Sequence, residues 1–589
     1  MDFPILTPHS LRETGMDTFG GYDHNPRIPE NSFFDLENMT SDGYPLLRAR
    51  GPRGRLPGAE NVTALLARDC LCRVEGPHFV INGYRVYLGL SAGEKQLVNM
   101  GAYVIIFPDK VYINTADLTD FGSLEAEYVS AAPVTFTPCD MDGNTSLPDY
   151  VGQTPPDSPQ NGQLWLDTEG LTLLQWSESG GLWAQVPQTF VRISAAGIGR
   201  GFAPGDGITL TGLEGSLTDA AGSPIPDPRF LYALGGAAVL EAVGQDFVVL
   251  PGLLGTTVTL SQRITLGRYV PETDFVTESG NRLWACRFGP DRSGAFVNEI
   301  YATKLGDFKN WQCFRGLSTD SFTLSLGDSA PFTGAAVHLG QPVFFREGCI
   351  HRIYGQLPEN FRLQTTSCQG VKKGCHNSIA QLEGNLLYQG EQGIFRYDGS
   401  LPRLISQALG RERYRGGRAA ASGGKYYIAL EDEAGQQPLF VYDSRRNLWH
   451  KESPLPTRQL CAQDGEIYSL SPAGTVITLL GSGEPEEETV TWMARTGLLG
   501  ITAPGGKRLH KLSLGLSLGA GSELRILARY DSAGPWETLG RITRREAAVF
   551  SLPLLPRRCG HMELRLEGRG EMTLHAVTKT MSEGGMAPW

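Results

Sequence analysis

Cysteine, histidine and carboxylate side chains are the groups in this chain whose chemistry is most versatile, and their spacing matches no familiar catalytic or metal-binding motif. Cys70 with Cys72, and Cys368 with Cys375 and His376, come nearest to a set of metal ligands. Neither set has the paired C-x-x-C spacing of a zinc site. The sequence also lacks a P-loop, a nucleophile elbow in a strand–turn–helix context and an H-E-x-x-H motif. We therefore expect no catalytic residue, no metal and no cofactor.

Glycoside hydrolysis needs a pair of carboxylates that meet only in the folded protein, so the sequence leaves this reaction open. Asp274, Glu278 and Glu299 are candidates, although ion pairing with Arg282 and Lys304 is the simpler role for them. The repeated S-x-D-x-G-x-x-W boxes of sialidase-type propellers are not found. A propeller glycosidase or lyase that acts on polysaccharide is therefore kept as an alternative function.

Four arginines and three tryptophans form two clusters that suit binding. Arg48, Arg50, Arg53 and Arg55 fall within eight residues, and they either face DNA or a neighbouring subunit, or form internal salt bridges. The second interpretation is favoured.

The tryptophans Trp165, Trp176 and Trp183 lie within nineteen residues. They form either a sugar-stacking platform or, as the favoured interpretation, the core of a small sheet.

Composition favours a protein with many turns and little long helix. The 589 residues include 73 Gly and 37 Pro, and short runs of aromatic and β-branched residues alternate with turn clusters. The Asn82–Gly83 dipeptide, for example, predicts a tight hairpin turn. The net charge of −11 opposes unspecific binding of nucleic acid by the whole surface. No apolar run is long enough for a membrane helix, and the N-terminus does not resemble a signal peptide.

The expected fold is all-β: a divergent β-propeller with an inserted β module, a C-terminal β-sandwich and an extended N-terminal arm. Seven segments follow from the turn clusters and composition shifts, namely an arm (1–60), the first part of the propeller (61–133), the inserted module (134–272), the remaining propeller (273–480), an acidic linker (481–488), the sandwich (489–580) and a tail (581–589).

Three motifs follow one another along the chain. The first, in the arm, contains Glu37, Asn38, Met39, Gly43, Arg48, Arg50 and Gly54. The second contains Gly306, Asp307 and Trp311, and the third contains Arg558, Cys559 and Arg565–Gly568. In this order they resemble a group of tailed-bacteriophage virion proteins, the tail tubular protein B, nozzle or stabilization proteins. The resemblance covers most of the chain except the insert.

The resemblance implies a non-enzymatic structural subunit that forms a ring around the DNA exit channel, in the neck or tail of a virion assembled in the bacterial cytoplasm. Its implied partners are other copies of itself, neighbouring proteins such as a portal or adaptor, and genomic DNA in transient contact, with no membrane insertion. A glycan-binding receptor protein of the tail, using the three tryptophans, is the first alternative, and the glycosidase or lyase is the second.

Overall fold

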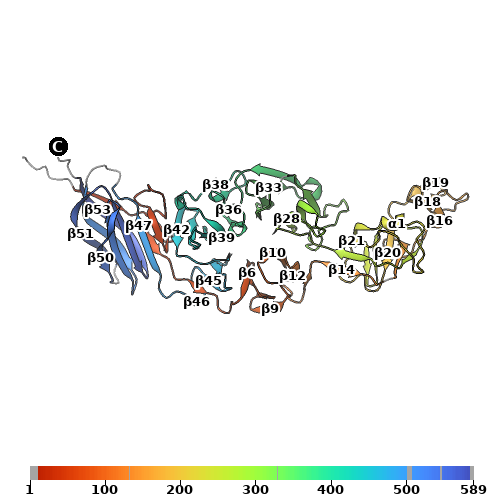
Figure 1. Ribbon diagram of the computed structural model, residues 1–589, viewed down its shortest axis with the longest axis horizontal. Helices are drawn as coiled ribbons and strands as arrows, with labels where there is room; N and C mark the ends of the chain where they lie inside the picture. The colour runs from red at the N-terminus through yellow and green to blue at the C-terminus, as the bar shows by residue number, and fades with distance from the viewer. Residues whose placement is uncertain (1–10, 132, 328, 501–506, 544–546, 584–589) are drawn as a thin grey trace, which may run out of the picture. The chain divides into compact units, whose positions relative to one another are not determined.

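The computed structural model describes residues 11–131, 133–327, 329–500, 507–543 and 547–583 (Figure 1). The fold is all-β, with a divergent propeller, an inserted β module, a C-terminal sandwich and an extended N-terminal arm, as predicted. Helical structure in the described chain is limited to α1 (Arg229–Tyr232) and the 3-10 turns η1 (Pro358–Asn360), η2 (His376–Ser378) and η3 (Gln407–Leu409). Residues 584–589 of the predicted tail lie outside the described residues.

Seven sheets of the described chain have the topology of propeller blades, in which strands consecutive in sequence pair as antiparallel neighbours. Their strands are β6 (Val62–Ala67), β7 (Leu71–Glu75), β8 (His78–Ile81), β9 (Tyr84–Tyr87); β10 (Gln96–Met100), β11 (Tyr103–Phe107), β12 (Val111–Asn114), β13 (Phe121–Ser123); β27 (Phe275–Glu278), β28 (Leu283–Pro290), β29 (Phe296–Ala302), β30 (Phe322–Ser325); β31 (Gly334–His338), β32 (Gln341–Phe345), β33 (Cys349–Tyr354), β34 (Arg362–Ser367); β35 (Ala380–Leu382), β36 (Asn385–Gly390), β37 (Gly393–Tyr397), β38 (Arg403–Leu404); β39 (Arg415–Ser422), β40 (Lys425–Glu431), β41 (Leu439–Asp443), β42 (Leu448–Glu452); and β43 (Gln459–Gln463), β44 (Glu466–Leu470), β45 (Val476–Thr478). The last sheet is completed by β5 (Gly54–Arg55) of the arm, which pairs with β45 and with β46 (Glu484–Pro485).

Turn chemistry and glutamine side chains hold the blades in register. Asn82 and Gly83 both have positive φ, 49° and 80°, and join β8 to β9 as the sequence predicted. The Gln96 amide bonds to both N–H and C=O of Val276 on the neighbouring sheet, at 3.1 and 2.6 Å. Gln459 makes the same double contact with Leu65, at 2.9 and 2.8 Å. Such amides satisfy backbone groups between neighbouring blades.

The inserted module consists of three sheets, drawn mainly in yellow tones (Figure 1). Its strands are β14 (Ala126–Val129), β15 (Val134–Cys139), β16 (Tyr150–Gly152), β17 (Leu164–Asp167), β18 (Thr172–Ser177), β19 (Leu182–Gln185), β20 (Phe190–Ser194), β21 (Gly207–Thr211), β22 (Gly236–Val239), β23 (Ala242–Gly244), β24 (Phe247–Pro251), β25 (Val258–Leu260) and β26 (Thr265–Arg268). A single hydrophobic core unites strands from all three sheets and includes Phe136, Leu166 and Leu266.

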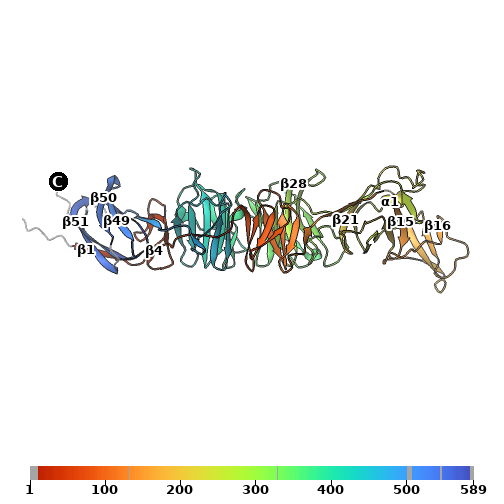
Figure 2. The ribbon, with the colours of Figure 1, turned by 90° about the horizontal axis from the view of Figure 1, so that it is seen from below.

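The sandwich consists of two sheets to which the arm contributes strands. The orders are β3-β4-β53-β48-β51, with β1 also paired to β53, and β2-β47-β52-β49-β50. Their strands are β1 (Leu11–Met16), β2 (Phe33–Glu37), β3 (Met39–Thr40), β4 (Leu47–Ala49), β47 (Thr491–Thr496), β48 (Lys507–Leu518), β49 (Glu523–Tyr530), β50 (Ala533–Ile542), β51 (Ala547–Cys559), β52 (Met562–Arg569) and β53 (Met572–Glu583). Figure 2 shows β1 and β4 at the sandwich. The extended arm therefore lies on the chain's own C-terminal domain.

The chain divides into two compact units. The first comprises Met1–Lys95, Phe344–His351 and Thr365–Trp589, and the second comprises Gln96–Val343 and Arg352–Gln364. In the first unit, one core combines arm residues such as Leu36 and Met39 with blade residues such as Phe440 and sandwich residues such as Leu564. The arm is thus part of the packing that joins the sandwich to its neighbouring blades.

Candidate functional sites

Asn38 lies at the centre of a polar cluster that fixes the arm. It is 2% exposed and adopts φ 56°, a left-handed conformation that asparagine tolerates better than most residues. Its amide nitrogen donates to the Thr491 carbonyl at 2.7 Å. Its amide oxygen accepts hydrogen bonds from the Arg50 Nε and from the Ser453 N–H, both at 2.9 Å. One side chain therefore connects the arm, a propeller blade and the start of the sandwich.

Two arginines and two glutamates complete this cluster, which we call the arm lock (Asn38, Arg50, Arg53, Glu452 and Glu487). Arg50 makes a bidentate contact with Glu487 at 2.7 and 3.0 Å, and Arg53 contacts Glu452 at 2.9 Å. Burial alone would raise the pKa of Glu487, but the Arg50 hydrogen bond and the Arg53 N–H outweigh it and hold the pKa below its ordinary value. A buried network of this kind is costly to break from one side.

The four predicted arginines separate into two pairs. Arg50 and Arg53 are 8% and 4% exposed and are paired internally, as the salt-bridge interpretation describes. Arg48 is exposed on β4, and Arg55 is half-buried on β5. Contact with DNA or a neighbouring subunit stays a prediction for Arg48 and Arg55. The glutamate partners lie about 400 residues further along the chain, so no local signal in the sequence marks them.

Other residues that carry the resemblance, or lie next to those that do, are also in close contact with segments far away in the sequence. Gly54 pairs with β45, and a Cβ there would collide with the Ser482 carbonyl oxygen. In the second unit, the Asn310 amide beside Trp311 contacts Asp307 at 2.5 Å and Asp206 of the insert at 3.1 Å. Trp311 is 1% exposed and packs in the core of that unit. These positions join segments that are distant in sequence.

A polar cavity of about 170 Å³ lies next to the arm lock, between the arm and the blade β39–β42. His450 lines this cavity, is 1% exposed, and has no hydrogen-bond partner for either ring nitrogen among the described protein groups. Burial, with Lys425 and Arg446, lowers the pKa of His450 to about 4, against the opposing influence of Asp443 and Asp42. The imidazole is therefore neutral at neutral pH. The histidines do not cluster in the sequence, so nothing there marks this one.

The three predicted tryptophans lie together on one small sheet, β16-β17-β18-β19. Trp176 is directly opposite Trp183, and Trp183 contacts Trp165 and Trp176 edge to face at 5.5 and 5.4 Å. Leu166, next to Trp165, packs into the insert core, so the tryptophans lie on the opposite face of the sheet. Trp165 is 7% exposed, whereas Trp176 and Trp183 are half-buried. The rings form a packed cluster with a partly accessible aromatic surface.

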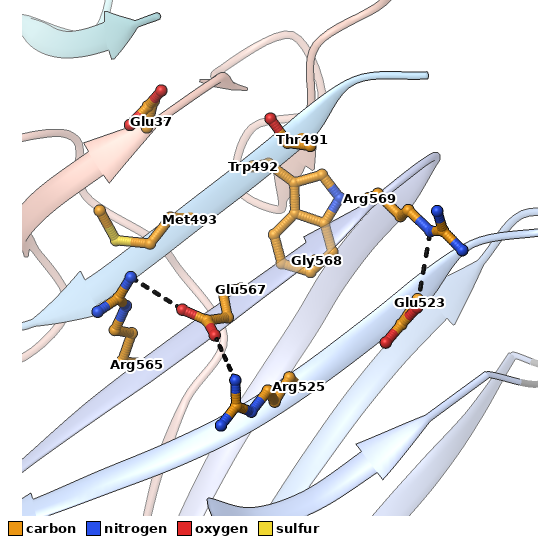
Figure 3. A pocket seen from close by; sticks show the side chains of 10 residues that line it. All are labelled: Glu37, Thr491, Trp492, Met493, Glu523, Arg525, Arg565, Glu567, Gly568 and Arg569. Atoms are coloured by element: carbon orange, nitrogen blue, oxygen red, sulfur yellow. Dashed lines mark hydrogen bonds and ion pairs between the residues drawn. The ribbon is translucent and has the colours of Figure 1, made fainter. Parts of the chain in front are cut away.

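A charged depression of about 520 Å³ lies on the sandwich sheet β2-β47-β52-β49-β50 (Figure 3). Glu567 contacts Arg565 at 2.9 Å and Arg525 at 3.4 Å, and Glu523 lies 3.6 Å from Arg569. Alternate positions of β52 place Arg565, Glu567 and Arg569 on the same face. Arg565–Gly568 belong to the third motif of the resemblance, but no binding role was predicted for them, although the alternation of charged residues along β52 was a signal for this site.

The three candidate carboxylates are engaged within the propeller. Asp274 accepts from Arg287 at 2.8 Å and from the Phe288 N–H at 2.7 Å. Glu278 accepts from the Asn281 N–H at 2.9 Å, and Glu299 accepts from a serine hydroxyl at 2.9 Å. Arg282 instead donates to backbone carbonyls, including that of Thr303. The simpler partners expected for these carboxylates, Arg282 and Lys304, are therefore not the ones that the structure provides.

The described residues contain no group of three or more histidine, cysteine, aspartate or glutamate side chains placed to hold a metal ion. No helix among them has the length and apolar character needed to cross a membrane.

The chain matches no protein-family model and no curated protein. Among solved structures, it is similar to a GH43 glycoside hydrolase engineered for endo-xylanase and exo-arabinofuranosidase activity, with 10% identity and a TM-score of 0.21, over 54% of this chain and 98% of that one. A sialidase of Trypanosoma rangeli has 9% identity and a TM-score of 0.24, over 69% and 94%. An exo-β-1,3-galactanase of Phanerochaete chrysosporium has 9% identity and a TM-score of 0.16, over 77% and 100%.

These similarities correct one expectation. Sequence analysis predicted that the chain is not an enzyme, whereas the similar solved structures named here are glycoside hydrolases and a sialidase. That prediction is contradicted and is not maintained. At these identities and TM-scores the similarity transfers no catalytic residue to this chain.

Proposed function

We propose that this chain is a structural subunit of a tailed-bacteriophage virion, a nozzle-like component that forms a ring around the DNA exit channel. What supports the proposal is the role of the arm motif that carries the family resemblance. Asn38 and Arg50 belong to the arm lock, Met39 lies in the core shared by arm, blade and sandwich, and Gly54 completes the last blade. The resemblance thus rests on residues that this architecture requires.

A subunit of a DNA-conducting ring has to stay intact under mechanical load. The arm pairs with both sheets of the sandwich through β1, β2 and β4 and with the last blade through β5, so it forms a second connection between the sandwich and that blade besides the acidic linker. Such a connection suits a load-bearing part better than a flexible linker does.

The mass of the purified full-length protein tests this proposal. Native mass spectrometry and light scattering across a concentration series should show a closed oligomer with a fixed number of copies, because head-to-tail contacts close into rings. A protein that stays monomeric at every concentration and salt condition would contradict the ring.

A second candidate is a glycan-directed function, by binding or by cleavage. The observation that favours it is the aromatic surface of the insert sheet, where Tyr150 is 41% exposed and paired with Trp165, and where Trp176 and Trp183 are half-buried. Aromatic rings with accessible faces stack on sugars because both present apolar surfaces. This observation concerns the insert alone.

Glycan-array binding and polysaccharide turnover test the second candidate. Trp176→Ala should lower binding about tenfold or more, the effect expected when a buried aromatic contact is lost. Phe296→Ala, at an aromatic residue that is 66% exposed on β29, is the matched control and should bind normally. Wild-type protein that neither binds nor cleaves any glycan would exclude this candidate.

A further inference from the structure

The sandwich sheet that contains the charged depression has a regular arrangement of arginine and glutamate. Glu563 is 3% exposed and contacts both Arg495 and Arg529 at 2.6 Å. The Trp536 ring lies beneath both guanidinium groups, whose centres are 5.6 and 5.0 Å from its centroid. This end of the sheet is largely covered.

The pattern repeats in the depression, where the side chains are more exposed. Glu567 lies between Arg565 and Arg525, and Glu523 lies between Arg569 and Arg541. Each glutamate therefore serves two arginines, and we call this surface the arginine face. Arg525, Arg541 and Arg569 have side chains that are 50%, 64% and 61% exposed.

The arginine face carries an excess of positive charge on a chain whose net charge is −11. On its exposed part, four guanidinium groups face Glu523 and Glu567, and Glu37, which also lines the depression, leaves a surplus of one positive charge. A guanidinium has five N–H donors, so one shared carboxylate leaves donors available for a further acidic group.

The same unit also presents an exposed acidic segment, the linker between the last blade and the sandwich. Glu484, Glu486 and Glu488 are exposed, and no ion pair joins their side chains to another described residue. Strand β46 pairs with β5, which holds Glu484 in place. Glu487 is excluded from this set because the arm lock uses it.

We propose that the arginine face binds the acidic linker of a second copy of this chain. The two surfaces differ, so the contact is head to tail, and repetition of it generates a ring when the rotation closes. Complementary charge also selects the register of the copies. The inference rests on the proposed ring function and names the surfaces that would build the ring.

Charge reversal on each surface tests the inference with the full-length protein. Arg525→Glu with Arg569→Glu should shift the ring toward monomer in native mass spectrometry and raise its dissociation constant about tenfold or more. Glu484→Arg with Glu486→Arg should do the same. All four changes together should restore the ring, because the charges are again complementary. Arg445→Glu, at a blade arginine whose side chain is 67% exposed, is the control and should leave the ring unchanged.

A thermal melt of each variant shows whether it folds, and Arg525→Gln with Arg569→Gln replaces the reversal if the latter does not fold. Rings that form equally well in all variants, or that the four combined changes do not restore, would overturn this inference and leave the proposed ring standing. A wild-type monomer would overturn both. If the arginine-face variants lose binding to a labelled DNA duplex while the ring persists, the face contacts nucleic acid and the inference is wrong.

Discussion

Arg50→Met should lower the free energy of unfolding by about 3–5 kcal/mol, in the transition that includes the sandwich. The Arg50 guanidinium satisfies Glu487 with two hydrogen bonds and Asn38 with one. Methionine keeps much of the volume but leaves the Glu487 carboxylate with the Arg53 N–H at 2.9 Å and the Arg53 guanidinium at 4.0 Å. A carboxylate that loses its main partner in a mostly buried site costs far more than the same loss at the surface.

Chemical denaturation followed by tryptophan fluorescence measures this effect, since Trp449 and Trp492 lie in the core that the arm completes. Limited proteolysis should also cleave the arm sooner in the variant. Arg48→Met is the matched control, because Arg48 is exposed on β4, two residues before Arg50, and its loss should cost less than about 0.5 kcal/mol. Equal stability of the two variants would show that the arm lock does not hold the arm.

His450→Gln should reduce the stability loss that wild-type protein shows as the pH falls from about 6.5 to about 4. In the folded protein, burial lowers the pKa of His450 to about 4, whereas an unfolded histidine titrates near 6.5. Within this window the unfolded state takes up a proton that the folded state does not, so acid favours unfolding. The difference of roughly 2.5 pKa units corresponds to about 3 kcal/mol at the lower end.

Denaturant midpoints measured at several pH values between 7 and 4 test this prediction. Tyr427→Phe alters the same cavity without changing a group that titrates in this range, so its pH dependence should match that of wild type. A His450→Gln protein with the wild-type pH dependence would contradict the prediction. Below the window, Glu487 and Asp443 should add a further loss of stability as they become protonated, because Arg50 holds the pKa of Glu487 low and the Ser41 hydroxyl, with Arg446, holds the pKa of Asp443 low.

Turn chemistry and strand periodicity determined the all-β fold class, because both depend on neighbouring residues. Asn82 and Gly83 form the predicted turn, and the hairpins predicted from residue 273 onward are paired in sheets with the topology of propeller blades. The tryptophan spacing was also sufficient to place all three rings on one small sheet. The boundary of the insert was harder to predict, because it depends on which distant strands pair. Strand β14 belongs to it although it precedes residue 134, since its partner is β26.

The sequence by itself determined the strand-rich architecture of the described residues, their low helix content and the position of the arm motif. Only the tertiary structure decided what the motif does: it pairs the arm with strands more than 400 residues away and buries Arg50 and Arg53 against Glu487 and Glu452. The tertiary structure also decided that His450 is neutral, because burial lowers its pKa, and that the arginine face exists, because strand pairing brings its residues together. Local patterns specify strands and turns, whereas electrostatics depends on which distant segments the fold brings together.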